Sequence, residues 1–172
     1  MKAALSLLRR RTIRVALVLV AAGIAVAGIA VGVLTATSDP SREQLIADRS
    51  ADVMPFDLAA TSHHFGPTAE GGLQTVVADD PADRRQVGLI QQHLRDEAAA
   101  FARGEFTDPA RIHGAEMPGL ATLRANSERL DIVFSLRTDG AELRYTTDDP
   151  VVLAALHDWF AAQTSDHQGH AG

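Results

Sequence analysis

Two stretches with the same layout decide the fold of this chain: GGLQTVVADDP at Gly71 to Pro81, and GAELRYTTDDP at Gly140 to Pro150. In each, glycine precedes a short run that favours β structure, and Asp-Asp-Pro follows. An aspartate before a helix accepts free backbone N–H groups, and proline suits the first helical position because the N–H it lacks would have no helical partner. Each stretch therefore predicts a strand followed by a helix.

The flanking residues complete two copies of one unit. A strand is expected before each stretch, at Ser62 to Phe65 and at Leu130 to Arg137, which predicts two hairpins. The fold class is thus α+β: a ββα-ββα domain whose four-stranded antiparallel sheet has helices on one face. Gly104 is placed to end the first helix. Apolar residues recur at helical spacing after both prolines: Val87, Ile90, Leu94, Ala98 and Phe101 after the first, and Val152, Leu153, Leu156, Trp159 and Phe160 after the second.

An uncharged apolar run precedes the domain: VALVLVAAGIAVAGIAVGVL at Val15 to Leu34. As a helix it would cover about 30 Å, the thickness of a bilayer's hydrocarbon core. Five basic residues lie before it, which places the N-terminus in the cytoplasm and the domain outside. We therefore predict an uncleaved, single-pass signal anchor in the cytoplasmic membrane. A cleaved signal peptide is the alternative, although a cut after Ala36 would leave Leu34 at the −3 position.

Composition limits the kinds of partner that the residues beyond the apolar run could bind. All 22 acidic residues, but only 11 of the 16 basic ones, lie beyond Ser38, so this part carries a net charge of −11. Such a charge repels nucleic acid. Cysteine is absent, which excludes disulfides and thiolate metal sites. The expected organisation is a basic cytoplasmic arm (1–14), a transmembrane helix (15–34), a spacer (35–53), a soluble α+β domain (54–164) and a polar tail (165–172).

Seven histidines are the main candidates for chemistry. Imidazole with methionine suits copper or haem iron, and both are plausible ligands outside the cytoplasm. His93 and His157 lie beside apolar helix positions, which favours structural roles for them. The remaining histidines and one methionine form the predicted metal or haem site: His63, His64, His113, Met117, His167 and His170.

Catalytic and phosphate-binding motifs are missing from the sequence. It has no GxSxG, CxxC or HExxH, and Gly71-Gly72 precedes a strand rather than a helix. The leading interpretation is therefore a non-enzymatic binding module. A protein-interaction module of an envelope complex, with structural histidines, is the alternative, and an uncharacterised enzyme comes third.

Three segments resemble a family of small bacterial domains that is frequent in actinobacteria. They are MPFDL at Met54, IHGAEMPGL at Ile112, and ALHDWFAAQTSDHQGH at Ala155. The resemblance covers about Met54 to His170 and implies no catalytic or ligand residues. Members are sometimes labelled aspartate carbamoyltransferase. This sequence does not support that label, because the domain is far shorter than such a catalytic chain and lacks its Ser-Thr-Arg-Thr phosphate loop.

Overall fold

The computed structural model describes residues 41–167. The predicted membrane span at 15–34 lies outside them, and no helix within them is long and apolar enough to cross a bilayer. The elements follow in the order α1 (Arg42–Val53), η1 (Leu58–Ala60), β1 (Thr61–Thr68), β2 (Gly71–Ala78), α2 (Arg84–Phe101), α3 (Thr107–His113), α4 (Leu120–Ala125), η2 (Ser127–Arg129), β3 (Asp131–Leu136), β4 (Gly140–Thr146) and α5 (Pro150–His167).

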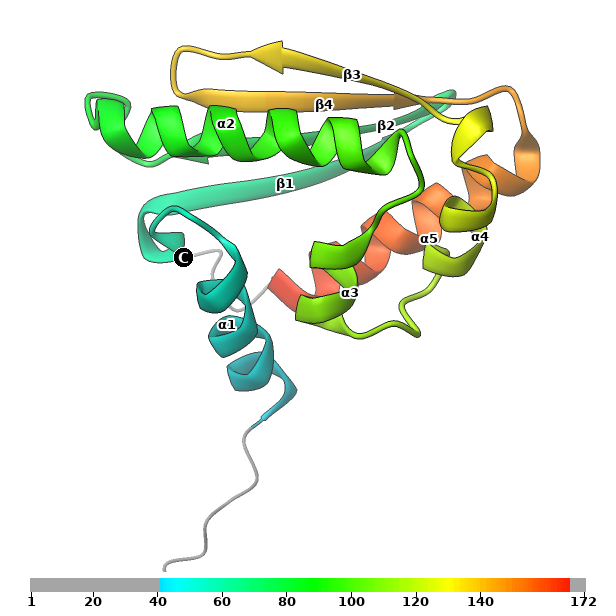
Figure 1. The fold of residues 1–172 in the computed structure, drawn as a ribbon, viewed down its shortest axis with the longest axis horizontal. Coiled ribbons are helices and arrows are strands. Elements are labelled where there is room, and N and C mark those ends of the chain that lie inside the picture. Colours follow the sequence, from blue (N-terminus) through cyan, green and yellow to red (C-terminus); the bar gives the residue numbers. More distant parts are fainter. Residues whose placement is uncertain (1–40, 168–172) are drawn as a thin grey trace, which may run out of the picture. The chain divides into compact units, whose positions relative to one another are not determined.

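The predicted four-stranded antiparallel sheet is confirmed. Its strand order is β1-β2-β4-β3, so the two hairpins join through their second strands (Figure 1). Gly71 pairs with Thr146 at one end of the β2–β4 ladder, and Val77 pairs with Gly140 at the other. The two stretches that share a layout in the sequence are therefore hydrogen-bonded neighbours at the centre of the sheet.

One side of the sheet carries the core. Neighbouring residues of a strand point to opposite sides, so Gly72, Gln74 and Val76 share a side of β2. Gln74 hydrogen-bonds Glu97 of α2, and a Cβ at Gly72 would lie 2.3 Å from the Phe160 ring of α5. Both long helices therefore pack against this side.

Aromatic side chains concentrate around Trp159, which is 1% exposed. Its ring meets Phe101 and Phe106 edge-on, with centroids 5.9 and 5.8 Å away, and Tyr145 at 6.1 Å. Such edge-to-face contacts stabilise a core beyond the area they bury. The cluster fastens α5 to α2 and to the segment that leads into α3.

The two Asp-Asp-Pro sequences begin their helices differently. α5 starts at Pro150 as predicted, and the Asp149 carboxylate accepts the Val151 and Val152 N–H groups. The matching prediction for α2 is wrong by three residues, since α2 starts at Arg84. Asp83 is its N-cap, and Asp80 accepts only the Ala82 N–H within a turn.

Helices also occupy segments that the sequence did not assign to the domain. α1 fills most of the predicted spacer, and a capping box between Ser41 and Gln44 begins it. α5 runs on to His167, through the start of the predicted polar tail. The Arg42 guanidinium and the Asp166 carboxylate, one from each helix, bond at 2.9 and 3.1 Å. The described domain thus begins at α1 rather than at Met54.

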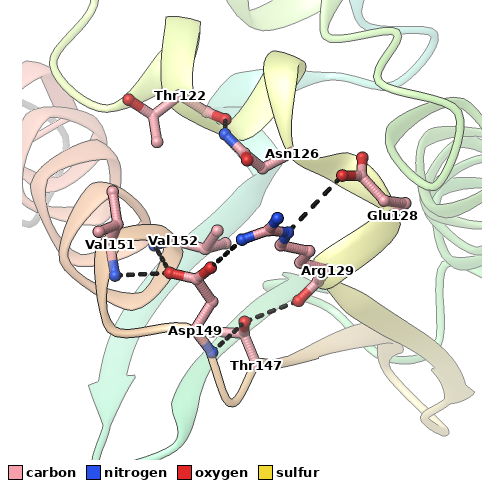
Figure 2. A network of polar contacts seen from close by, with 8 residues as sticks. All are labelled: Thr122, Asn126, Glu128, Arg129, Thr147, Asp149, Val151 and Val152. Carbon is pink, nitrogen blue, oxygen red and sulfur yellow. Dashed lines mark hydrogen bonds and ion pairs between the residues drawn. The ribbon is translucent and has the colours of Figure 1, made fainter.

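A polar network fixes the start of α5 to the segment before β3 (Figure 2). Arg129 Nη1 donates to Asp149 Oδ2 at 2.6 Å, and Thr147 Oγ1 donates to the Arg129 carbonyl, also at 2.6 Å. These bonds from Arg129 and the backbone hold the pKa of Asp149 below its usual range. Asp149 therefore serves both as a helix cap and as a link between the second hairpin and its helix.

Replacing Asp149 with alanine should lower the free energy of unfolding by about 1–2 kcal/mol, the usual cost of losing an N-cap. The exposed ion pair with Arg129 should add little. Urea unfolding of residues 41–172 would measure the change. Asp148→Ala, an exposed neighbour, is the matched control and should change stability by no more than a few tenths of a kcal/mol. Equal effects of the two substitutions would contradict the capping role.

Candidate functional site: a histidine-lined cavity

A small cavity of about 20 Å³ lies where β1 and β2 meet α2, α3 and α5. A space of this size accommodates one water molecule or a single ion. Its lining is unusually polar for the interior of a domain. Six of its lining residues carry polar side chains: His63, Gln74, His93, Glu97, His113 and Gln163.

The structure separates two of the predicted ligands, His63 and His64. Both lie on β1, where adjacent side chains point to opposite sides. His63 lines the cavity, whereas His64 is exposed and does not. The cavity instead receives His93 from α2, which the sequence analysis assigned a structural role. The Phe56 ring contacts the rings of both His63 and His93, with centroids 5.9 and 5.5 Å away.

His113 is the last residue of α3, which ends because Gly114 adopts a φ of +102°. Its side chain is 2% exposed, and Nδ1 lies 2.8 Å from Asp166 Oδ2. Burial lowers the pKa of His113, partly offset by the bond to Asp166, and so favours its neutral imidazole.

Asp166 joins three helices through its carboxylate. Besides its bond with His113 of α3, it accepts hydrogen bonds from Nε and Nη2 of Arg42 in α1. Burial alone would raise the pKa of Asp166, but the bonds from Arg42 and His113 together hold it below its usual value. Asp166 was not among the predicted site residues, because the polar residues from 165 onward resemble a tail in the sequence. The spacing of Leu156, Trp159 and Gln163 could have extended the helix as far as Asp166.

Met117 is placed away from the cavity. It is 6% exposed and belongs to the hydrophobic core, and it is not among the residues that line the cavity. A helix from His113 to Met117 would have put both on one face, but the chain leaves the helix at Gly114. Met117 is therefore not among the residues that line the cavity with His113.

A chain of buried polar side chains forms one wall of the cavity. Tyr145 Oη donates to Gln74 Oε1 at 2.6 Å, and Gln74 Nε2 donates to Glu97 Oε2 at 3.3 Å. Burial raises the pKa of Glu97 to about 8 and lowers that of His93. His93 Nε2 and Glu97 Oε1 lie 3.7 Å apart, within ion-pair range, but burial favours the neutral form of both groups. The wall of the cavity thus contains one protonated carboxyl group, that of Glu97.

The remaining histidines differ in what the structure says of them. His157 Nε2 lies 3.0 and 2.9 Å from the carbonyls of Thr68 and Gly71, which gives it the structural role predicted for it. The His167 side chain and all of His170 lie outside the described residues. Within the described part of the chain, no three His, Asp or Glu side chains are close enough to hold a metal ion by themselves.

Comparison with known proteins identifies no relative. No family model, curated protein or solved structure matches the chain. The resemblance to small actinobacterial domains therefore stays a prediction, and function must be argued from the geometry of the site.

Glu97→Gln should remove a component of the pH dependence of stability. Because folding raises the pKa of Glu97 from 4.5 to about 8, the folded protein binds the extra proton between these values. This stabilising contribution is full below pH 4.5 and is lost as pH rises to about 8. Thermal unfolding from pH 5 to pH 9 should thus show the variant gaining stability relative to the parent as pH rises. Asp96→Asn, at an exposed neighbouring position, should show no such gain. If the difference in stability between Glu97→Gln and the parent does not vary with pH, Glu97 is not a buried neutral acid.

Proposed function

We propose that this protein is a non-enzymatic binding module that holds a transition-metal ion outside the cytoplasmic membrane. The observation that carries the proposal is the bond between His113 Nδ1 and the Asp166 carboxylate, beside a cavity that two further histidines line. Histidine ligands of metals commonly donate their second ring nitrogen to a carboxylate in this way, which orients the ring and raises its basicity.

The geometry supports a particular ligand set. His63 and His113 line the same cavity, and His93 is a third imidazole in its wall. His170 lies four residues beyond Asp166, so at most about 14 Å of chain separates it from the carboxylate that binds His113. We propose His63 and His113 as ligands, with His167 or His170 completing the site. His64 and Met117 leave the proposed set because of where they are placed.

The donor set favours copper(II) and then zinc(II). Neutral imidazoles suit both ions, and a given nitrogen site binds Cu²⁺ more tightly than Zn²⁺. A volume of about 20 Å³ suits an ion and is far too small for a porphyrin, which removes haem from the proposal. Glu97, whose carboxyl faces the same space, would lose its proton more readily beside a bound cation.

The proposed location rests on the apolar run at 15–34, which would leave the domain outside as a single-pass membrane protein. Its net charge of −11 is consistent with cations rather than nucleic acid as partners.

Titration of residues 41–172 with CuSO₄ should show one site per chain, and bound metal should raise the melting temperature. His113→Ala should abolish tight binding, and Asp166→Asn should weaken it by about 10–100-fold, the usual effect of losing a carboxylate behind a ligand. His64→Ala is the matched control and should bind like the parent. Absence of stoichiometric binding of either copper or zinc would refute the proposal.

Membrane topology can be tested with single cysteines, because the chain has none of its own. A membrane-impermeant maleimide added to intact cells should label Ala161→Cys, which is exposed on α5, but not Ala3→Cys in the basic arm. Both should react after lysis. Protection of Ala161→Cys in intact cells would place the domain inside.

A protein-interaction module of an envelope complex is the second candidate. It is favoured by two apolar side chains on the edge strand β3, where Val133 is 55% exposed and Leu136 is 61% exposed. As an edge strand, β3 also presents backbone N–H and C=O groups with which a strand of a partner could pair. Loss of a co-purifying envelope protein in Val133→Asp, with metal binding unchanged, would favour this second function.

A further inference from the structure

A second and larger pocket lies between α1 and β1. Its volume of about 440 Å³ falls within the roughly 300–1,000 Å³ that is typical of small-molecule sites. Most of its lining is apolar. α1 contributes Ile46 and three small residues, and the segment before β1 contributes Phe56, Leu58 and Ala59. Small residues along α1 leave the space open between the helix and the strand.

A buried hydroxyl in the wall of this pocket has no hydrogen-bond partner in the described part of the chain. Ser50 is 3% exposed, and its Oγ makes no hydrogen bond within residues 41–167. Ser50 also lines the pocket. Because buried hydroxyls are nearly always satisfied, this one is placed to hydrogen-bond an oxygen of a molecule in the pocket. The ligand is therefore apolar over most of its surface and polar at one point.

The charge around the pocket argues for a neutral ligand. Among the described residues that line it, none is lysine or arginine. The one carboxylate in the lining, Asp57, already accepts the Ala59 N–H. An anionic head group would find no lysine or arginine among the described residues that line the pocket, and the net charge of −11 beyond Ser38 would repel it.

We propose that this pocket binds a neutral lipid with a single acyl chain and an ester or hydroxyl oxygen, of the monoacylglycerol type. The acyl chain lies between α1 and β1, and the polar oxygen bonds Ser50. The argument rests in part on the proposed anchor. Only residues 35–41 separate the apolar run from α1, a span of at most about 25 Å, so the pocket is within reach of lipids in the bilayer.

The pocket also borders the histidine-lined cavity. His63 and Phe56 each line both spaces, so the cavity lies on one side of them and the pocket on the other. A lipid seated between α1 and β1 would therefore contact a proposed metal ligand directly. α1, which forms the outer wall of the pocket, is fastened to Asp166 through Arg42, and Asp166 in turn holds His113.

Photo-crosslinking of the full-length protein tests the proposal. The protein is placed in phosphatidylcholine nanodiscs that contain a monoacylglycerol with a diazirine in its acyl chain, and adducts are mapped by mass spectrometry. We expect adducts in residues 43–64 in addition to those in residues 15–34, which serve as the internal reference. Ala47→Leu, which fills the pocket, should lower the 43–64 signal several-fold, and Ser50→Ala should lower it to a smaller extent.

Matched controls make the result decisive. Two substitutions at exposed positions of α5 should leave the signal unchanged: Ala161→Leu, and Ser165→Ala, which removes a hydroxyl that donates to the Ala162 carbonyl. Circular dichroism checks folding, and Ala51→Leu is a second filling variant. Adducts confined to 15–34, or a 43–64 signal that both filling variants leave intact, would overturn the lipid site while leaving the anchor intact. If a photoreactive fatty acid labels residues 43–64 equally well, the proposal that the ligand is neutral is overturned. If residues 43–64 are labelled only in a variant truncated after His167, the occupant of the pocket is the protein's own C-terminal end.

Discussion

The close approach of β2 and β4 is the constraint on which the rest of the structure depends. A Cβ at Gly71 would lie 1.8 Å from the Tyr145 carbonyl oxygen, and one at Gly140 would lie 2.0 Å from the Val76 carbonyl oxygen. Glycine is thus required at both ends of the ladder that joins the two hairpins. Without this ladder, each hairpin with its helix would be too small to bury its own apolar face.

The same central strands carry the polar interior. Gln74 of β2 and Tyr145 of β4 lie on the side that faces the helices, and they connect to Glu97 through two hydrogen bonds. A buried carboxyl costs stability unless it is neutral or paired, and here burial keeps it protonated at pH 7. A domain that needed only a stable core would be better served by apolar residues at these positions. Their presence beside three histidines is what makes the cavity a candidate site rather than a packing defect.

Much of the fold was predictable because it rests on local signals. Strand and helix periodicity, the two turns and the Asp149 cap are all read within about ten residues. The start of α2 was predicted wrongly because the sequence offers two capping aspartates: Asp80 accepts the Ala82 N–H in a turn, whereas Asp83 accepts the Arg85 and Gln86 N–H groups that begin the helix. α1 was taken as a spacer because its sequence is polar. It is held to the domain by Ile46 in the interior and by the bond from Arg42 to Asp166, 124 positions away.

The candidate site was predictable only in its residue types. Histidine content without cysteine pointed to metal chemistry, and His63 and His113 do line one cavity. That His93 and Glu97 complete the wall, that His64 faces away and that Met117 lies in the core depend on which side of each element faces the interior.

The sequence by itself determined the classes of element and the pairing of two similar units, because hydrophobic period and turn chemistry are local properties of the chain; that the domain lies outside the membrane stays a prediction. Only the tertiary structure decided which polar side chains meet. Asp166 finds His113 and Arg42, and Ser50 is left with a buried hydroxyl beside an apolar pocket, because strand order and helix packing bring together residues that lie far apart in the sequence.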